Sequence, residues 1–570
     1  MGNLGAIDEG RRPYRPYDSI KRRTSGVQMS LIAALNNLQS QRGYLTEKDL
    51  RDLALERRVP LYAVEAVVSF YPHFRTSPPP ESRVAVCRDM ACHLAGSDGL
   101  CSTLEQLLAG QDAEVGTVSC LGRCESAPAV AINDVPLDGS DVDRIVTVAN
   151  RPETAAEHAI AVGTRRWALD PYESEADRYG VIRRLRGGEA LDVIATLNAS
   201  GLAGCGGAAF PTGRKWQLVA QQEERTKYVI CNADESEPGT FKDRVIINDL
   251  PHLILEGMMI AARSIGAAKG YVFIRHEYEA ERERLAAEIE SAQKVGHLDD
   301  SFDVEIFTSP GGYILGEETA LLECMEDRRG EPRNKPPFPG QAGLHGKPTL
   351  INNVETFAAA TAILHRGASW WQSAGVEGCR GLKFISVSGD VERADVYLIP
   401  MGTTVQQLIE MAGGVKDGKP LKAFAPGGAS SNFLPADMAA TPMDFEHLAK
   451  AGSMLGSGAL FVVAEGRDML ELGANVLRFF RNESCGKCVP CRVGSEKAHR
   501  MLEDTLAHGG KRAQLELLEE LSDTMHQTSI CGLGQVALGP VLSVVKHFSE
   551  DVAKHVSDWE SDGATERRRE

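Results

Sequence analysis

Four cysteines near the C-terminal end constrain what this chain can fold into. Cys485, Cys488 and Cys491 form a C-x2-C-x2-C run of seven residues, and Cys531 follows after 39 further residues. Three closely spaced thiolates can hold three corners of a [4Fe-4S] cube while a distant fourth closes it. Structural zinc is the alternative, but zinc modules usually pair two C-x2-C knuckles. The spacing therefore predicts an iron-sulfur centre and a chain that carries electrons.

A second group of four cysteines lies in the N-terminal third of the chain. Cys87 and Cys92 form a C-x4-C pair directly after a predicted strand, and Cys120 and Cys124 form a C-x3-C pair after another strand-like segment. Two pairs on two loops can face each other and bind a [2Fe-2S] rhomb, with two thiolates for each iron. Zinc is again the alternative, although a C-x3-C pair is unusual for a zinc knuckle.

Composition narrows the class of protein further. A formal net charge of -17 over 570 residues argues against nucleic acid as a ligand, since phosphate binding requires a basic face. The longest apolar stretch, 253–268, is interrupted by Glu256 and Arg263, so we expect no membrane-spanning segment. Tight cysteine pairs in so long a chain suit metal-bound thiolates in a reducing compartment, and we expect a cytoplasmic protein.

Two stretches of the sequence resemble subunits of one respiratory enzyme. Residues 28–145 resemble the small thioredoxin-like [2Fe-2S] subunit of complex I, with Val-Ser-Phe-Tyr-Pro at 68–72 in the place of its helix-bundle signature. Residues 180–550 resemble the flavin-bearing, NADH-oxidising subunit of the same machine. Fusion of the two resembles the diaphorase subunits of NAD-linked hydrogenases and the β subunits of some NAD-dependent molybdenum or tungsten formate dehydrogenases. The resemblance implies FMN, NAD, a [2Fe-2S] and a [4Fe-4S] cluster as cofactors.

Changes in hydrophobic periodicity, read beside this resemblance, predict an α/β multidomain fold. Short β-like runs followed by the helix-like segment 405–411 suit a small β-grasp (SLBB-like) unit. Apolar residues recur at helical spacing after residue 446. The predicted units are a flexible basic arm (1–27), a helical bundle (28–78), a thioredoxin-like [2Fe-2S] domain (81–150), a linker (151–178), an α/β FMN/NAD-binding domain (179–378), a β-grasp domain (379–445), a C-terminal helical [4Fe-4S] domain (446–558) and a disordered tail (559–570).

A glycine loop lies early in the predicted flavin domain. Gly204, Gly206 and Gly207 belong to a G-x-G-x-x-A match, which is a weak signal on its own. The segment 191–197 before it reads as a helix and the clear strand, 227–230, comes after it, so the context of a dinucleotide-binding Rossmann turn is missing. The loop instead resembles the complex I glycine loop that cradles FMN and the stacked nicotinamide. Backbone N–H groups approach a phosphate closely only where no Cβ intervenes.

Other predicted flavin contacts follow from the same resemblance. It assigns Lys215 to the flavin phosphate, and Asn352 and Asn353 to the phosphate or ribityl chain of FMN. A structural glycine-rich turn is the alternative interpretation of the loop. The family usually has arginine or glycine at three positions of this loop, which here are Ala203, Cys205 and Ala209.

An acidic segment, 231–244, resembles the flavin-binding motif of the family almost throughout. By that likeness, Asn232 and Asp234 bind the ribityl chain and the ring edge of the flavin. Glu235 and Glu237 line the nicotinamide side and are the predicted catalytic residues. A solvated acidic face is the alternative interpretation of such a run.

The segment 311–319 resembles the nucleotide-binding turn of the family. The likeness implies that Tyr313, with Gly316 in the same turn, stacks on or bonds to the cofactor. Glu317 and Glu318 accept hydrogen bonds from adenosine ribose hydroxyls, where a carboxylate repels a 2′-phosphate and favours NAD over NADP. The alternative is a structural turn with two solvated glutamates.

We find no site in the sequence for a substrate other than the dinucleotide, so the chain is predicted to be one subunit of a larger enzyme. Residues 488–497 and 426–430 look closer to the β subunits of formate dehydrogenases than to hydrogenase diaphorases. The resulting prediction is a soluble NAD-dependent formate dehydrogenase, whose catalytic subunit carries further iron-sulfur clusters and a molybdenum or tungsten cofactor. A hydrogenase diaphorase, a fused complex I module and a non-catalytic relay or zinc-stabilised docking subunit are the alternatives.

Overall fold

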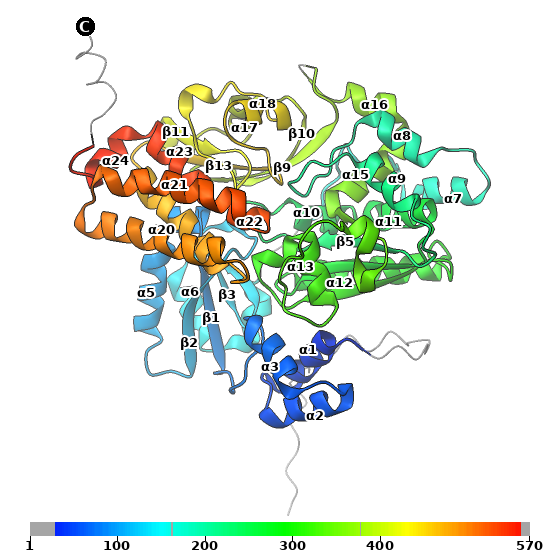
Figure 1. Ribbon diagram of the computed structural model, residues 1–570, viewed down its shortest axis with the longest axis horizontal. Helices are drawn as coiled ribbons and strands as arrows, with labels where there is room; N and C mark the ends of the chain where they lie inside the picture. Colours follow the sequence, from blue (N-terminus) through cyan, green and yellow to red (C-terminus); the bar gives the residue numbers. More distant parts are fainter. Residues whose placement is uncertain (1–28, 161–162, 377, 560–570) are drawn as a thin grey trace, which may run out of the picture.

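The computed structural model describes residues 29–160, 163–376 and 378–559, which form five units in chain order (Figure 1). The predicted α/β multidomain fold is confirmed. The predicted basic arm, 1–27, lies outside the described residues, as does nearly all of the predicted tail.

The first unit is a bundle of three short helices. It packs against the third unit, the parallel-sheet unit described below, through hydrogen bonds. The Tyr71 hydroxyl donates to the carbonyl of Arg328 at 2.6 Å, and the backbone N–H of Ile32 donates to Asp327 at 3.1 Å. These contacts fix the bundle, which lies at the lower edge of the molecule in Figure 1. The bundle helices are α1 (Leu31–Arg42), α2 (Glu47–Arg57) and α3 (Leu61–Phe70).

The second, thioredoxin-like unit has a four-stranded sheet of order β2-β1-β3-β4. Strand β1 runs parallel to β2 and antiparallel to β3. Because β1 and β2 are parallel, the segments that follow them leave the same edge of the sheet. Strand β1 ends at this edge with Cys87. The unit comprises β1 (Ser82–Cys87), α4 (Ala91–Leu94), α5 (Ser97–Leu107), β2 (Ala113–Val118), β3 (Ala129–Ile132), β4 (Val135–Asp138) and α6 (Val142–Ala149).

The segment predicted as a linker, 151–178, is anchored to the third unit. Trp167 Nε1 donates to Asp249 at 2.6 Å, and the Tyr172 hydroxyl donates to the buried Glu256, also at 2.6 Å. Two short 3-10 turns, Pro152–His158 and Glu175–Asp177, interrupt the segment. Its described part is therefore held against the core by aromatic side chains.

The third, parallel-sheet unit has four strands in the order β7-β6-β5-β8, all parallel. Helices α11 and α15 cross so closely that a Cβ on Gly257 would lie 2.4 Å from the Phe357 carbonyl oxygen. Ligands of open parallel sheets bind beyond the carboxyl ends of the strands. Its elements are α7 (Gly180–Arg186), α8 (Val193–Ser200), α9 (Thr212–Ala220), β5 (Tyr228–Ala233), α10 (Lys242–Asp249), α11 (Pro251–Ile265), β6 (Lys269–Arg275), α12 (Glu279–Lys294), β7 (Asp303–Ser309), α13 (Glu318–Met325), α14 (Pro339–Ala342), β8 (Thr349–Asn353), α15 (Val354–Arg366) and α16 (Ala368–Ser373).

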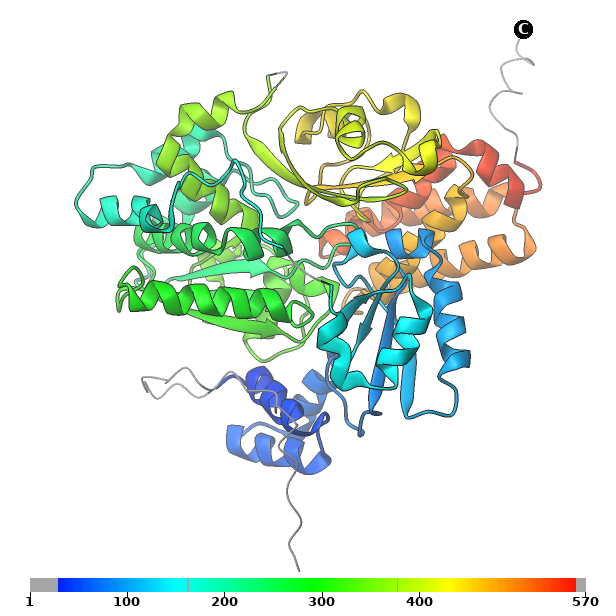
Figure 2. The ribbon, with the colours of Figure 1, turned by 180° about the vertical axis from the view of Figure 1, so that it is seen from behind.

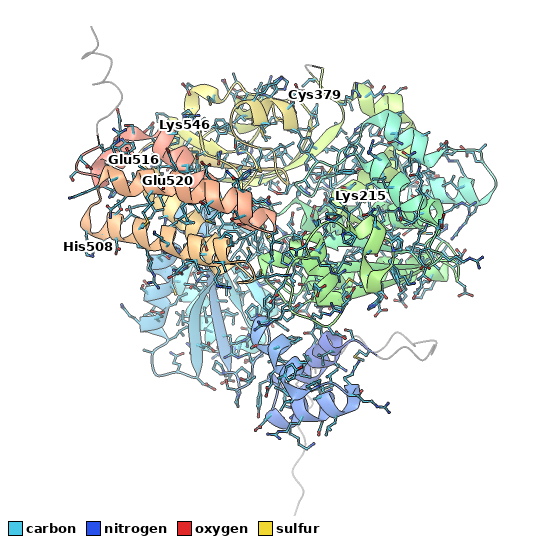
Figure 3. The ribbon with its side chains drawn as sticks, viewed as in Figure 1. Lys215, Cys379, His508, Glu516, Glu520 and Lys546 are labelled. Atoms are coloured by element: carbon cyan, nitrogen blue, oxygen red, sulfur yellow. The ribbon has the colours of Figure 1, made fainter. Side chains whose placement is uncertain are left out.

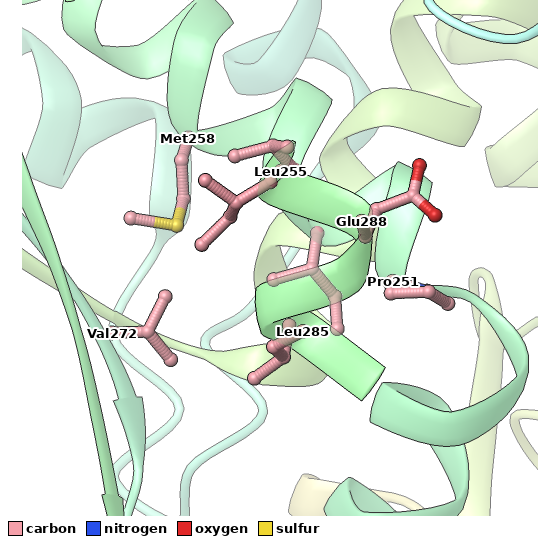
Figure 4. Close-up of a pocket in the computed structure, with 8 residues that line it drawn as sticks. Pro251, Leu255, Met258, Val272, Leu285 and Glu288 are labelled. Atoms are coloured by element: carbon pink, nitrogen blue, oxygen red, sulfur yellow. The ribbon is translucent and has the colours of Figure 1, made fainter. Parts of the chain in front are cut away.

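A small pocket lies in the interior of this unit, between α11, α12 and β6 (Figure 4). Its lining is apolar, with Met258 and Val272 among its residues, apart from Glu288. Glu288 accepts a hydrogen bond from the Tyr179 hydroxyl at 2.7 Å. This pocket is part of the hydrophobic core, and its lining offers no phosphate or ribose contacts for a dinucleotide.

The fourth, β-grasp unit extends further along the chain than predicted. Strand β13 lies between β9 and β11 in a five-stranded sheet, so the prediction of a helical unit that begins at residue 446 is wrong for 446–464. All six β13 residues are buried, and the strand therefore lacks the apolar/polar alternation that marks a half-exposed strand. The elements are β9 (Leu382–Gly389), β10 (Asp395–Pro400), α17 (Val405–Met411), β11 (Leu421–Ala425), β12 (Leu434–Pro435), α18 (Phe445–Lys450) and β13 (Ala459–Ala464).

The fifth, C-terminal helical unit lies between the β-grasp and thioredoxin-like units (Figures 1 and 2). Asn475 on α19 joins it to the thioredoxin-like unit, because its side chain donates to the carbonyl of Arg88 and accepts from the N–H of Met90, both at 2.9 Å. The helices are α19 (Met469–Asn482), α20 (Val489–His508), α21 (Arg512–Thr528), α22 (Gly532–Val536), α23 (Gly539–His547) and α24 (Ser549–His555).

Within the described residues, no single helix combines the length and apolar composition needed to cross a membrane. Helices α10 and α11 pass those criteria only as a pair, and they are bent by 91° at their junction.

Candidate cofactor sites

The structure brings the four N-terminal cysteines together at the edge of the thioredoxin-like sheet, and we call them the N-terminal quartet. All four side chains are buried. Cys120 Sγ lies 3.9 Å from Cys124 Sγ. Hydrogen bonds with Cys120 and Cys92 raise the pKa of the Cys87 thiol. Cys87 therefore contacts one cysteine of its own pair and one of the other pair. The two pairs therefore face each other as the spacing predicts.

The surroundings of the N-terminal quartet suit a [2Fe-2S] group. The backbone N–H of Gly122 lies 3.3 Å from Cys120 Sγ, and that of Ala129 lies 3.4 Å from Cys92 Sγ. Hydrogen bonds to sulfur are among the factors that tune the potential of such a centre. Arg275, at the end of β6, donates to the Cys120 carbonyl at 2.7 Å and adds a buried positive charge from the parallel-sheet unit.

Three of the four C-terminal cysteines, the C-terminal quartet, lie at helix N-termini, and Cys485 lies in the loop between α19 and α20. Cys488 is the N-cap of α20, Cys491 lies in its first turn, and Cys531 is the N-cap of α22. A Cβ on Gly534 would lie 2.9 Å from Cys491 Cβ, so α22 rests on the start of α20 and brings Cys531 to the run. The positive end of α20 favours a negatively charged group.

The thiols of the C-terminal quartet are partly shielded from water. Cys491 is buried, while Cys485, Cys488 and Cys531 are half-buried. Burial raises the pKa of Cys491 to about 11 and that of Cys531 to about 12. Burial therefore opposes the thiolate form of Cys491 and Cys531, and a bound metal would offset that effect.

The glycine loop lies over the carboxyl end of β8. It connects α8 to α9, and β5 follows, so the predicted departure from a Rossmann turn is confirmed. A Cβ on Gly206 would lie 3.1 Å from Asn353 Cβ, and Gly207 has a φ of +116°. Ala209, where the family usually has glycine, has a φ of +54°. Close backbone approach and left-handed φ angles make this loop a tight turn, which is compatible with the predicted cradle for a flavin phosphate.

Three of the predicted flavin contacts gather beneath this loop. Trp216 Nε1 donates to Asn352 Oδ1 at 2.9 Å, which fixes the orientation of that amide. Lys215 Nζ donates to the Ile351 carbonyl at 3.0 Å, and it lies on the parallel-sheet unit in Figure 3. Asn353 caps α15 by accepting from the N–H of residue 355 at 2.9 Å. The structure therefore brings together Lys215, Asn352 and Asn353.

Two other predicted flavin contacts, Asn232 and Asp234, lie at the end of β5, beside the predicted nucleotide-binding turn (311–319). Asn232 Nδ2 donates to the Gly316 carbonyl at 2.9 Å. Asp234 accepts from the hydroxyls of Ser236 at 2.7 Å and Ser309 at 3.1 Å. Burial raises the pKa of Asp234 to about 6, against the opposing effect of Arg275. These side chains form a preorganised wall at the carboxyl edge of the sheet.

Of the predicted catalytic glutamates, Glu235 is buried and Glu237 is half-buried, and both are held by protein donors. Glu235 accepts from the backbone N–H of Asp243 at 2.8 Å and of Arg244 at 3.2 Å, at the start of α10, and burial raises its pKa to about 7. Glu237 accepts from the Tyr313 hydroxyl at 2.5 Å. Burial also raises the pKa of Glu237. The acidic run is therefore an internal wall of the site and not a solvated face.

Glu317 and Glu318, at the start of α13, are flanked by lysines. Glu317 accepts from the N–H groups of residues 319 and 320 at 2.8 and 2.9 Å, and its other oxygen pairs with Lys335 at 2.8 Å. Glu318 lies 2.9 Å from Lys335 Nζ and 3.6 Å from Lys215 Nζ. Sequence reasoning missed Lys335, which lies in a proline-rich loop without a motif.

A buried ion network that the sequence did not reveal ties the β-grasp unit to α10 and α15 of the parallel-sheet unit, beside the predicted flavin contacts. Lys242, at the start of α10, lies 3.0 Å from Glu355 and 2.5 Å from Asp243. Glu355 also pairs with Lys383 in β9 and accepts from the N–H of Phe384 at 2.9 Å. Lys242 and Lys383 are almost completely buried, so their charges depend on these partners.

Glu483 connects both quartets to the nucleotide turn. It follows α19, two residues before Cys485, and accepts from the Ser119 hydroxyl at 2.6 Å beside Cys120. Its other oxygen accepts from the backbone N–H of Tyr313 at 2.8 Å. Its proximity to Cys485 in sequence was the only signal for this role.

Sequence profiles of known families match four parts of the chain. The thioredoxin-like [2Fe-2S] ferredoxin matches residues 17–151 and the Nuo51 FMN-binding domain matches 197–362. The SLBB domain matches 384–431, and the NADH-ubiquinone oxidoreductase-F iron-sulfur binding region matches 471–555. The predicted FMN, [2Fe-2S] and [4Fe-4S] cofactors are confirmed. Fold and sites together define an NADH-binding flavin and iron-sulfur electron-transfer subunit.

Curated relatives and solved structures agree with that class. An NADH-quinone oxidoreductase subunit of Rhizobium meliloti is 40% identical over 399 residues, which cover 68% of this chain and 94% of that protein. The chain belongs to this family of NADH-quinone oxidoreductase subunits. NADP-reducing hydrogenase subunit HndC of Solidesulfovibrio fructosivorans is 39% identical over 64% of this chain and 76% of that protein. An air-oxidised NAD+-reducing [NiFe]-hydrogenase has a chain with a TM-score of 0.85, 31% identity and coverage of 94% of this chain and 95% of that one.

Proposed function

We propose that this chain is the NAD(H)-binding flavin and iron-sulfur subunit of an NAD-dependent formate dehydrogenase, which converts formate and NAD+ to CO2 and NADH. The observation that carries the electron-transfer role is the position of Tyr313. Its hydroxyl binds Glu237 in the predicted nicotinamide wall, and its backbone binds Glu483 beside the C-terminal quartet. One residue therefore joins the two sites between which electrons must pass.

The residues around the glycine loop bind and orient. When bound, FMN converts the two-electron hydride of a nicotinamide into the single electrons that iron-sulfur centres accept. In our proposal, Lys215, Asn352 and Asn353 hold its phosphate and ribityl chain, and Asn232 and Asp234 hold the ring edge. Because Trp216 and the cap of α15 fix the two asparagines, little side-chain entropy is lost on binding.

Glu235 and Glu237 line the nicotinamide side in this proposal and act as fixed walls. Hydride transfer requires no general base, so neither carboxylate has to move a proton. The backbone N–H groups of α10 hold Glu235, and the Ser430 N–H holds Glu237 at 2.6 Å. Rigid acceptors of this kind suit the amide and hydroxyl donors of a dinucleotide.

The second candidate function is the diaphorase subunit of an NAD-linked hydrogenase. The two candidates differ in the metal that the partner catalytic subunit carries. Residues 426–430 and 488–497 resemble formate dehydrogenase β subunits. A hydrogenase diaphorase is favoured by the likeness to the [NiFe]-hydrogenase chain over nearly the whole length. Metal analysis of the native complex decides between them. Molybdenum or tungsten supports our proposal, and nickel contradicts it in favour of the hydrogenase.

The isolated chain provides a test of the subunit role itself. We expect the chain reconstituted with iron, sulfide and FMN to reduce artificial acceptors with NADH and to show no formate oxidation. The reason is that the described residues hold the proposed flavin and nicotinamide wall, while the sequence offers no motif for a second substrate. Bound flavin and iron exclude a non-catalytic or zinc-stabilised docking role, whereas formate oxidation by the chain alone would contradict the proposal.

Dinucleotide choice tests the proposed adenosine site. The relative named NADP-reducing indicates that NAD is not the only possibility in this family. Replacing Glu317 or Glu318 by glutamine removes a negative charge and leaves Lys215 and Lys335 less neutralised, so a 2′-phosphate is repelled less. We expect the NADPH/NADH ratio of kcat/KM to rise about tenfold, equivalent to about 1.4 kcal/mol.

Steady-state kinetics with both dinucleotides measure that ratio. Glu323→Gln, on the same helix but paired with Arg333, is the matched control and should leave the ratio unchanged. An unchanged ratio in both Glu317→Gln and Glu318→Gln would place these carboxylates away from the adenosine ribose.

A further inference from the structure

Three side chains with different metal-binding atoms converge on the β-grasp unit, outside both quartets and the flavin wall. Cys379 Sγ lies 3.0 Å from Asp444 Oδ2, and His447 Nδ1 contacts the same oxygen. One ligand atom from each residue lies within 4.8 Å of the other two. Cys379 is at the outer rim of the β-grasp unit, away from Lys215 (Figure 3).

The local fold aims these atoms at one another. Asp444 is the N-cap of α18, and its Oδ1 accepts from the N–H groups of Glu446 at 2.7 Å and His447 at 2.8 Å. That capping leaves Oδ2 to face His447, one turn along the same helix, and Cys379. Burial opposes the charge of Asp444, but hydrogen bonds from Cys379 and α18 hold its pKa below the usual value. The carboxylate is therefore a preoriented anionic ligand.

The thiol approaches from a separate turn that precedes β9. The N–H of Cys379 donates to the Val376 carbonyl at 2.9 Å, which shapes that turn. Gly402 faces the thiol with a φ of +97°, and a Cβ there would lie 3.1 Å from Cys379 Sγ. A side chain at this position would therefore crowd both the Val376 carbonyl and the sulfur. Two segments of chain, the turn and α18, therefore meet at the three ligand atoms.

We propose that Cys379, Asp444 and His447 form a binding site for zinc or a similar divalent metal of borderline softness. Thiolate, imidazole and carboxylate are the ligands that zinc takes in proteins, whereas calcium and magnesium require sites built of oxygen. Three protein ligands leave one tetrahedral position open. The site is unrelated to the proposed formate reaction.

The site is accessible to metal from solvent. The side chain of His447 is 44% exposed, while Asp444 is buried. His447 also lines a surface cavity of about 790 Å³, together with Thr403, Gln407 and Glu410. Water or a small external donor entering this cavity can supply the fourth ligand.

Metal binding has a defined proton balance. Bonds form from the metal to Cys379 Sγ, His447 Nδ1 and Asp444 Oδ2, and the Cys379 S–H bond breaks. Nδ1 of a neutral His447 faces the Asp444 carboxylate, which can only accept, so its proton is on Nδ1 before metal binds. The Nδ1–H bond therefore breaks while an Nε2–H bond forms, and the one proton that leaves to solvent for each ion comes from Cys379. No electron is transferred. Because the metal joins the turn at Cys379 to α18, it also stabilises this edge of the β-grasp unit.

The test uses the purified holo chain with its iron-sulfur clusters and FMN in place, so that the quartets are already occupied. Zinc is titrated against a chromophoric chelator while iron content is monitored. We expect one zinc per chain without loss of iron. Zinc X-ray absorption should show one sulfur at about 2.3 Å and nitrogen or oxygen ligands at about 2.0–2.2 Å.

Variants decide whether this cluster is the ligand set. Cys379→Ser should weaken zinc binding at least about tenfold, as should His447→Ala, whose half-exposed side chain can be truncated without opening the core. Cys101→Ser and His508→Ala, which lie elsewhere (His508 is labelled in Figure 3), should bind zinc like the wild type. Unchanged binding in both site variants, a zinc shell without sulfur, or zinc uptake matched by iron loss would each overturn the proposal.

Discussion

The two cysteine quartets are built in opposite ways. The N-terminal quartet is wholly buried at and just beyond a sheet edge, and Arg275 of the parallel-sheet unit donates to its backbone. Three cysteines of the C-terminal quartet lie at helix N-termini, three of its thiols are half-buried, and Val489 and Val493 beside it are 59% and 53% exposed. Packing between units therefore encloses the N-terminal quartet, whereas the C-terminal quartet lies close enough to the surface to exchange electrons with a partner protein.

The largest expected difference between the quartets is in electron flow to the partner. Cys488→Ser should reduce NAD-linked turnover of the assembled complex by a factor on the order of a hundred or more, yet leave FMN bound and NADH-to-dye activity intact. Cys120→Ser is the matched variant of the N-terminal quartet and should retain most of that turnover. Steady-state rates with partner and with dye separate the two. Equal losses in both variants would put the two centres on one obligatory path.

A second comparison concerns glycines with similar backbones inside the two quartets. Gly122 has a φ of +67°, and a Cβ there would lie 2.2 Å from the hydroxyl of the buried Tyr278. Gly486 has a φ of +77°, and a Cβ there would meet nothing closer than Arg492 Cδ at 3.9 Å. We expect Gly122→Ala to lower the free energy of unfolding by about 3 kcal/mol or more, and Gly486→Ala by only about 1 kcal/mol.

Denaturant unfolding followed by cluster absorbance measures both values, since each quartet reports its own unit. Similar losses at the two positions would show that the N-terminal quartet is no more tightly enclosed than the C-terminal one.

The smallest expected effect tests the contact that links the two regions. Glu483→Ala removes acceptors for the Ser119 hydroxyl and the Tyr313 N–H, which should cost about 2 kcal/mol. Ser119→Ala removes only one of these donors and should cost about 1 kcal/mol. The free energies of unfolding of both single variants and of the double variant complete a double-mutant cycle. Strictly additive losses would mean that Glu483 and Ser119 do not act together.

Sequence predicted the parts of the site whose chemistry is local. The cysteine spacings placed both quartets, and the glycine loop was separated from a Rossmann turn by the helix before it. Glu483, Lys335 and Lys383 could not be found in this way, because their roles depend on partners that only the fold brings near. Ser119 lies 364 residues from Glu483 along the chain. Strand β13 was missed because burial of both faces removes the alternation on which strand prediction depends.

The anchored segment, 151–178, connects the thioredoxin-like and parallel-sheet units covalently, and this connection affects how the two units associate. The oxidoreductase relative from Rhizobium meliloti matches only 68% of this chain, whereas one polypeptide here carries both quartets. Covalent connection turns the docking of the two units into an intramolecular event with a high effective concentration. Their contact, which includes the buried Arg123–Glu281 pair at 3.2 Å, therefore does not have to survive dilution. Each copy of the chain also supplies the two sets of cysteine ligands in a fixed ratio of one to one.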